Sequence, residues 1–201
     1  MNEAHLSLVT PETAAEYAGM LAKDDIPALI ERLASSEDKV RYPAFLLLRA
    51  RSAAAPDVCP HWDALAEKLQ SENSYQRSIG AMLLSANARW DDDGRMRRDL
   101  PHLLELLNDE KPITVRQCIQ SLPDILSAQP ALADEIAAAL LRIDLMQIRE
   151  SMRKLILSDL LEALIAVRSI APEPAVDAYL FSALSGSILD EKTKKRLHAR
   201  L

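Results

Sequence analysis

Two stretches of this sequence decide its fold: IPALIERL at residues 26–33 and LPHLLELL at residues 100–107. Pro27 and Pro101 occupy the same place in the two stretches and lie 74 residues apart (101 − 27), which is two units of 37. A weaker copy lies between them, at residues 62–69. A helix-sized apolar segment that returns with this period predicts a stack of helical hairpins.

The composition indicates an ordered, helical protein. Of the 201 residues, 49% are hydrophobic, 27% are charged, only 4% are aromatic and 4 are glycine. Ala and Leu lose little side-chain freedom in a helix, whereas strands favour β-branched and aromatic residues. We therefore expect an all-α protein.

The net charge and the cysteine content limit the kinds of partner and of cellular compartment that we expect for this protein. The net charge is −6, whereas a protein built to hold nucleic acid usually carries an excess of Lys and Arg. The N-terminal residues do not resemble a secretory signal, and no apolar run approaches the ~20 residues that cross a bilayer. Cys59 and Cys118 are too few and too far apart for a disulfide framework or a zinc cluster, and we expect each to be a small, partly buried apolar residue. The sequence thus predicts a cytoplasmic protein without a membrane partner.

Polar and proline-containing breaks divide the chain into helices. A first helix follows Thr10 and Pro11 and runs to about Leu21, and two short helices are expected at 175–183 and 189–201. Between them we expect four helix pairs, at 25–34 with 39–54, 59–69 with 74–90, 96–107 with 113–128, and 132–143 with 147–168. The prediction is a single domain over 1–201, with an N-terminal cap (1–24), about four pairs (25–170) and a C-terminal cap (171–201).

An arginine recurs near the start of each second helix, at a spacing close to that of the apolar repeat. The four residues are Arg41, Arg77, Arg116 and Arg153, which lie 36, 39 and 37 residues apart. The segments DKVR at 38–41 and ITVR at 113–116 resemble the turn and second-helix start of the HEAT family of armadillo-type α-helical repeats. The resemblance covers about residues 25–165. It implies a short HEAT-like solenoid, an α-α superhelix of about four hairpins with terminal capping helices.

The resemblance also implies a role for these arginines. In HEAT repeats the turn aspartate and the second-helix arginine form a ladder that joins neighbouring repeats, and here its members would be Asp38, Arg41, Arg77, Asp109, Arg116 and Arg153. The arginines could instead form a track that binds phosphates. We favour the ladder, because an arginine held by a carboxylate is largely unavailable to a ligand.

No motif points to catalysis, and we predict no catalytic residue, no metal ligand and no cofactor. His5, His61, His102 and His198 lie on different elements and lack the spacing of convergent metal ligands. The paired His-Glu motifs of the iron-dependent hydroxylases that are built from HEAT repeats do not occur. The sequence also has no glycine-rich phosphate loop and no Gly-x-Ser-x-Gly motif.

Two segments allow a nucleic-acid hypothesis. Some alkylpurine DNA glycosylases resemble HEAT solenoids and use tryptophan, aspartate and basic residues at the lesion, and such residues gather here as Trp90, Asp91, Asp92, Arg95, Arg97 and Arg98. The simpler interpretation is a turn in which Asp93 caps a helix and Trp90 closes an apolar end. Residues 190–200 hold five cations and two carboxylates, which suits a solvated capping helix or an anionic partner.

The resemblance implies that the second helices line the inner surface, where a partner would bind. From the arginine register we expect an outward-facing strip that consists of Tyr42, Leu46, Arg49, Ser78, Met82, Gln117, Ser121, Asp124 and Lys154. This strip has no dominant charge and offers apolar anchors for a peptide or helix. The leading hypothesis is a non-enzymatic protein-protein interaction scaffold or adaptor, the second is DNA binding or base excision, and the third is a subunit that acts only inside a larger assembly.

Overall fold

The computed structural model describes residues 6–201, which are almost entirely helical. About 78% of the structure is helix, and no strand occurs in the described range. The all-α prediction is therefore confirmed. The chain divides into two compact units, the first ending at Met96 and the second beginning at Arg97. The first five residues of the predicted N-terminal cap, including His5, lie outside the described residues.

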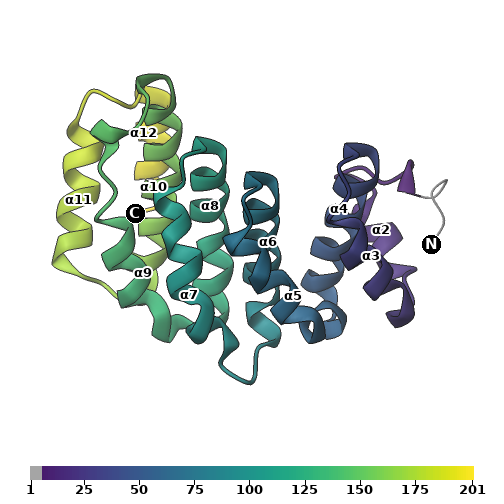
Figure 1. The fold of residues 1–201 in the computed structure, drawn as a ribbon. Helices are drawn as coiled ribbons and strands as arrows, with labels where there is room; N and C mark the ends of the chain where they lie inside the picture. Colours follow the sequence, from purple (N-terminus) through teal and green to yellow (C-terminus); the bar gives the residue numbers. More distant parts are fainter. Residues whose placement is uncertain (1–5) are drawn as a thin grey trace. The chain divides into compact units, whose positions relative to one another are not determined.

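The first unit is organised around two long helices, α4 (Asp38–Ala54) and α6 (Ser74–Asn87). Helix α4 packs against α6 and also against the shorter helices α2 (Ala14–Gly19) and α3 (Ile26–Arg32), while α6 packs against α5 (Trp62–Ala66). The neighbours α3 and α4 can be followed in Figure 1, as can α5 and α6. The fully buried side chains of this unit include Leu29, Leu47, Leu48, Trp62, Leu83 and Leu84.

The second unit is organised around α10 (Glu150–Ile170). This helix packs against α8 (Pro112–Ala128), α9 (Ala133–Leu140), α11 (Pro174–Ser185) and α12 (Glu191–His198). Helix α7 (Arg95–Glu105) spans the division between the units. Short 3-10 helices connect or extend the helices of both units: η1 (Lys23–Asp25), η2 (Pro56–His61), η3 (Glu67–Gln70), η4 (Ala88–Trp90), η5 (Leu106–Asn108), η6 (Pro130–Leu132) and η7 (Leu145–Gln147).

Every helix expected in residues 10–201 has a counterpart, and the largest difference in length lies in the first helix of the second pair. The sequence predicted a helix over 59–69, but regular α-helix covers only Trp62–Ala66, between the 3-10 segments η2 and η3. Pro56 and Pro60 both lie in η2, where a proline supplies no N–H to a longer helix. Pro43 and Pro123, by contrast, lie inside α4 and α8, and both helices continue past them.

Gly80 lies at a close approach between helices of the first unit. A Cβ atom at this position would lie 3.0 Å from the Leu65 carbonyl oxygen and 3.0 Å from the Lys68 Cβ. The absent side chain therefore lets α6 pack directly on α5 and η3.

Candidate functional site

Three of the four recurring arginines hold the turn that precedes their own helix. Each donates a hydrogen bond to a backbone carbonyl five or six residues earlier: Arg41 to Ser35 at 2.9 Å, Arg77 to Ser71 at 2.8 Å and Arg153 to Ile148 at 2.8 Å. Such bonds satisfy turn carbonyls and fix the start of the second helix. Because all three arginines make the same contact, each of them lies near the start of its own helix.

The contacts of the predicted ladder carboxylates are mostly local. Asp38 forms an ion pair with Arg41 of its own helix, and the Asp109 carboxylate accepts a hydrogen bond from the Lys111 amide in the turn. Arg116 forms an interhelix ion pair with Asp159 of α10, with 2.6 Å between Nε and Oδ2. The sequence analysis did not single out Asp159. A ladder that joins neighbouring repeats stays a prediction.

The predicted interaction strip is only partly on the surface. Four of its members are exposed (Tyr42, Arg49, Asp124 and Lys154) and three are half-buried (Leu46, Met82 and Gln117). The prediction of exposure is wrong for Ser78 and Ser121, which are only 4% and 5% exposed. A serine is small enough to lie where helices pack closely, and the Ser121 hydroxyl donates to the Cys118 carbonyl of its own helix.

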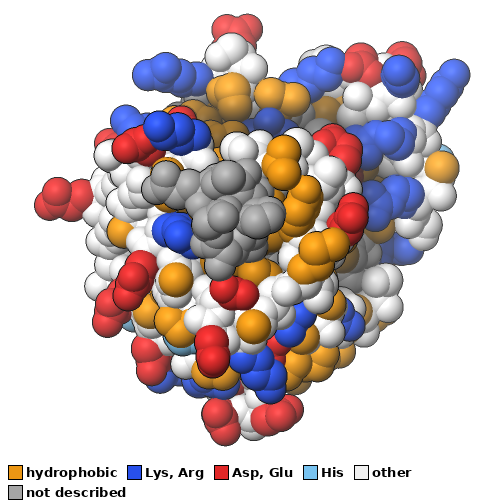
Figure 2. All heavy atoms as spheres, turned by 90° about the vertical axis from the view of Figure 1, so that its right-hand side faces the viewer, with side chains coloured by type: hydrophobic (Ala, Val, Ile, Leu, Met, Phe, Trp, Pro, Cys, Tyr) orange, Lys and Arg blue, Asp and Glu red, His pale blue; other side chains and the backbone are white. Residues whose placement is uncertain are grey.

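Two exposed tyrosines lie at the start of α4 and α6, and we call them the tyrosine pair. Tyr42 stacks on Phe45 with 6.5 Å between ring centroids, and Tyr75 lies 4.9 Å from the guanidinium of Arg41. The rings nevertheless remain 49% and 61% exposed. Figure 2 shows a face of the molecule on which acidic and basic side chains are interspersed around hydrophobic ones. The pair thus offers apolar surface with fixed neighbours.

The Trp90–Asp91 segment is part of the packing of the first unit. The Asp91 carboxylate accepts hydrogen bonds from the backbone amides of Arg95 at 3.0 Å and Met96 at 2.8 Å, and its side chain has no exposed area. The Trp90 indole donates to the Ser52 carbonyl at 2.6 Å. The expectation that Asp93 caps the helix was therefore wrong, because Asp91 reaches the first amides of α7.

The other residues of the DNA hypothesis do not join this segment in an open site. Arg95 donates to the Cys59 carbonyl at 3.2 Å and lies 5.4 Å from the buried Trp62 ring. Asp92 and Arg97 are exposed, and Arg98 forms an ion pair with Asp99. The structure thus gives Trp90, Asp91 and Arg95 packing contacts that already use their polar atoms.

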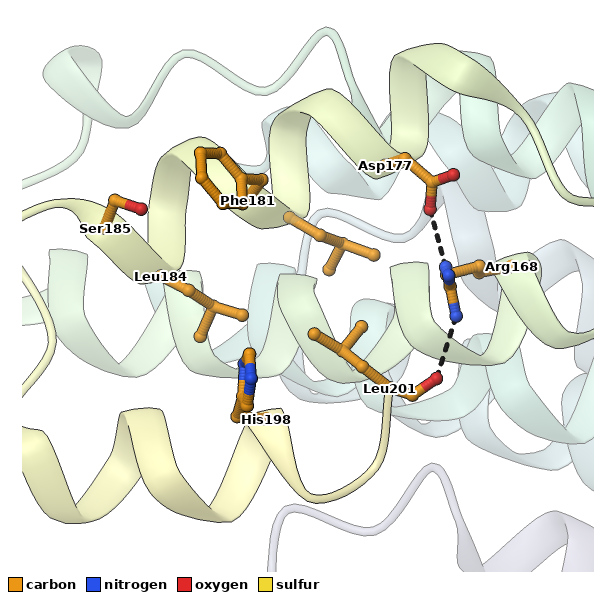
Figure 3. Close-up of a pocket in the computed structure, with 8 residues that line it drawn as sticks. Arg168, Asp177, Phe181, Leu184, Ser185, His198 and Leu201 are labelled. Atoms are coloured by element: carbon orange, nitrogen blue, oxygen red, sulfur yellow. Dashed lines mark hydrogen bonds and ion pairs between the residues drawn. The ribbon is translucent and has the colours of Figure 1, made fainter.

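A groove that the sequence did not predict lies between α11 and α12, over α10. It measures about 390 Å³ and is lined by Arg168, Asp177, Leu180, Phe181, Leu184, Ser185, His198 and Leu201. Figure 3 shows Leu184 and His198 facing each other across it. At one end Arg168 joins α11 to the last residue, with 2.5 Å to the Asp177 carboxylate and 2.8 Å to the Leu201 carbonyl oxygen. The one signal for this groove in the sequence is the segment that forms α11, which is mostly apolar and has Asp177 as its single charged residue.

Basic side chains of α12 lie beside this groove. Arg196 and Arg200 both pair with Glu162 of α10, and Lys194 pairs with Glu191 at 3.0 Å. Asp190, at the N-cap of α12, pairs with Lys154, and this contact lowers the pKa of the Asp190 carboxyl. The helix therefore carries more cations than its carboxylate neighbours neutralise.

The described residues contain no cluster of three or more His, Cys, Asp or Glu that could hold a metal ion. Both cysteines are buried, more completely than the sequence led us to expect, and burial raises the pKa of the Cys59 and Cys118 thiols. In residues 6–201 no helix is both long and apolar enough to cross a membrane.

Comparison with known proteins gives a fold likeness and no family. No family model matches the chain, and no curated protein matches it. Among solved structures, the chain is similar to an engineered protein known from its crystal structure, with a TM-score of 0.52 and 17% sequence identity. The match covers 100% of this chain and 95% of that chain. A likeness at this identity bears on the fold alone.

Proposed function

We propose that this protein is a non-enzymatic protein-protein interaction scaffold or adaptor of the cytoplasm. In this proposal its helices form a short HEAT-like solenoid of about four hairpins, and the second helices present the surface that a partner binds. Within the first unit, the exposed strip members Tyr42 and Arg49 form that surface together with Tyr75.

The tyrosine pair is the observation that carries the proposal. Tyrosine is enriched among the residues that dominate protein interfaces, because it buries a large ring at a low cost in side-chain entropy. The stack on Phe45 and the contact with Arg41 restrict the side-chain conformations of Tyr42 and Tyr75 further, so less side-chain entropy is lost on binding. Two held, exposed rings on neighbouring helices favour a protein partner.

The test is affinity capture of the tagged protein from a lysate of its own cells, before and after nuclease treatment. We expect a stoichiometric partner that survives nuclease and is lost when Tyr42→Asp and Tyr75→Asp are combined. Met20→Asp is the matched control, because Met20 is an apolar side chain of the same unit that is 69% exposed.

Circular dichroism should give the same helical signal for all these proteins. Unchanged capture by the double variant would refute the proposed surface. Material that disappears on nuclease treatment would instead favour the DNA hypothesis, which predicts strongly salt-dependent binding.

A further inference from the structure

Helix α11 exposes apolar residues to solvent. Ala175, Ala178 and Phe181 recur every three residues and are all exposed, on a side of the helix that also carries the exposed Ser182 and Ser185. Phe181 is 76% exposed, the largest fraction among the exposed large hydrophobic residues of the described chain. A surface helix normally presents charged residues to water, so this side has the character of a contact surface.

The groove beside this helix continues into a second hollow. The first hollow has an apolar lining from Leu180, Phe181 and Leu184, and the second, of about 440 Å³, is lined partly by Lys194 and Lys195 of α12. Leu184 and His198 line both hollows, so they form the boundary between the two. The second hollow is also lined by Glu191, which pairs with Lys194, so an extended segment that crosses this boundary would pass from apolar side chains to a lining with one lysine in excess.

The charge around α12 is opposite to that of the whole protein. Six cations and three carboxylates lie on α12 and its ion-paired neighbours, a local balance of +3 in a chain of net charge −6. They are Lys154, Lys192, Lys194, Lys195, Arg196 and Arg200, with Glu162, Asp190 and Glu191. Lys192 and Lys195 are exposed and have no carboxylate partner in the described structure. An acidic partner would therefore be attracted to this edge of the groove.

We propose that the groove between α11 and α12 binds a linear acidic peptide segment of a protein partner. A large apolar side chain of the segment occupies the hollow at Leu180, Phe181 and Leu184, and neighbouring Asp or Glu residues meet Lys194 and Lys195 in the second hollow. A single-stranded nucleic acid suits the groove less well, because its bases stack on series of aromatic side chains and the lining offers only two aromatic rings, those of Phe181 and His198. This site is separate from the tyrosine pair and does not depend on the scaffold surface proposed above.

The test is selection of random linear peptides displayed on phage against the full chain, followed by anisotropy titration of the best synthetic peptide. We expect enrichment of sequences in which a large apolar residue is flanked by Asp or Glu. Phe181→Asp should weaken binding at least ~10-fold, because it removes the apolar anchor and adds a repelling charge. Lys195→Glu should weaken it about 3- to 10-fold at low salt and less at high salt.

The controls are Met20→Asp for the apolar change and Arg97→Glu for the charge change, since both side chains are exposed and lie outside the groove. Both should bind within about 2-fold of the parent, as expected for surface positions outside an interface. Enrichment without acidic residues, or affinity that Phe181→Asp leaves unchanged, would overturn the proposal.

Two further outcomes would give the groove another occupant and would also overturn the proposal. One is binding of a labelled oligothymidylate that Phe181→Asp abolishes. The other is a dimer in analytical ultracentrifugation that becomes monomeric in Phe181→Asp. Loss of the partner in the tyrosine variants, with peptide binding intact, would leave the two surfaces independent.

Discussion

Replacing Asp91 tests whether this carboxylate is a structural cap or part of a ligand site. In the structure it accepts hydrogen bonds from two first-turn amides of α7 and lies 3.4 Å from the Arg95 Nε. Loss of a helix cap costs ~0.5–2 kcal/mol. Loss of a hydrogen bond from a buried or charged group adds ~1–3 kcal/mol, so Asp91→Ala should lower the free energy of unfolding by about 1.5–5 kcal/mol.

The assay is urea unfolding followed by far-ultraviolet circular dichroism, with linear extrapolation to water. Asp91→Asn keeps one oxygen acceptor and should lose about half as much stability as Asp91→Ala. Asp92→Ala is the matched control, because this exposed neighbour should change stability by no more than ~0.5 kcal/mol. If Asp91→Ala were as stable as Asp92→Ala but had lost affinity for DNA, the capping argument would be refuted and the lesion-binding hypothesis supported.

Three further predictions concern packing, acid stability and the thiols. Gly80→Ala should destabilise the protein by ~1–3 kcal/mol through overcrowding, although alanine is ~1 kcal/mol better in a free helix; a raised melting temperature would contradict the close packing. Asp57→Asn should cost about 1–3 kcal/mol at neutral pH, because the amide keeps an oxygen acceptor but loses the charge that strengthens the hydrogen bonds from Arg51, and these bonds lower the Asp57 pKa. The pKa of Asp57 in the folded protein lies below its unfolded value of ~3.9. The stability that the Asp57–Arg51 pair contributes is therefore present above pH ~3.9 and disappears as the pH falls through the folded pKa. If the stability difference between the parent and Asp57→Asn, measured by urea unfolding, stayed constant as the pH was lowered, this would count against a contribution from the pair. Cys59 and Cys118 should react with Ellman's reagent slowly in the folded protein and fully after unfolding, because burial raises their pKa, and rapid reaction of either native thiol would contradict that burial.

The helices could be predicted from the sequence because their signals are local. Apolar periodicity and the Ser- and Asp-containing turns predicted the starts of α4 and α8 to within one residue. The same signals predicted the last residue of each helix correctly. The shortening of the helix around Trp62 was harder to predict, since it depends on how far the 3-10 geometry around Pro56 and Pro60 extends. Pro43 and Pro123 show that packing can carry a helix past a proline.

The surface and the groove depend on contacts between helices, which the arginine register does not contain. Ser78 shares its expected helical position with the exposed Tyr42 and Lys154, and Ser121 shares its position with the half-buried Leu46 and Met82. Both serines are nevertheless buried, because their burial depends on which neighbouring helix approaches them. Whether Asp91 or Asp93 caps α7 depends likewise on the geometry of the turn between them and the helix. The groove exists only because α11 and α12 both pack on α10, which no spacing within either helix reveals.

The most direct test of the protein-binding role is photocrosslinking from the surface itself. A benzophenone amino acid would replace Tyr42 of α4 or, as the control, the exposed Glu31 of α3, and each protein would be irradiated in a lysate of its own cells. We predict a discrete protein adduct at position 42 that resists nuclease and does not form at position 31. The absence of an adduct at position 42, or an adduct that nuclease removes, would contradict the protein-binding role.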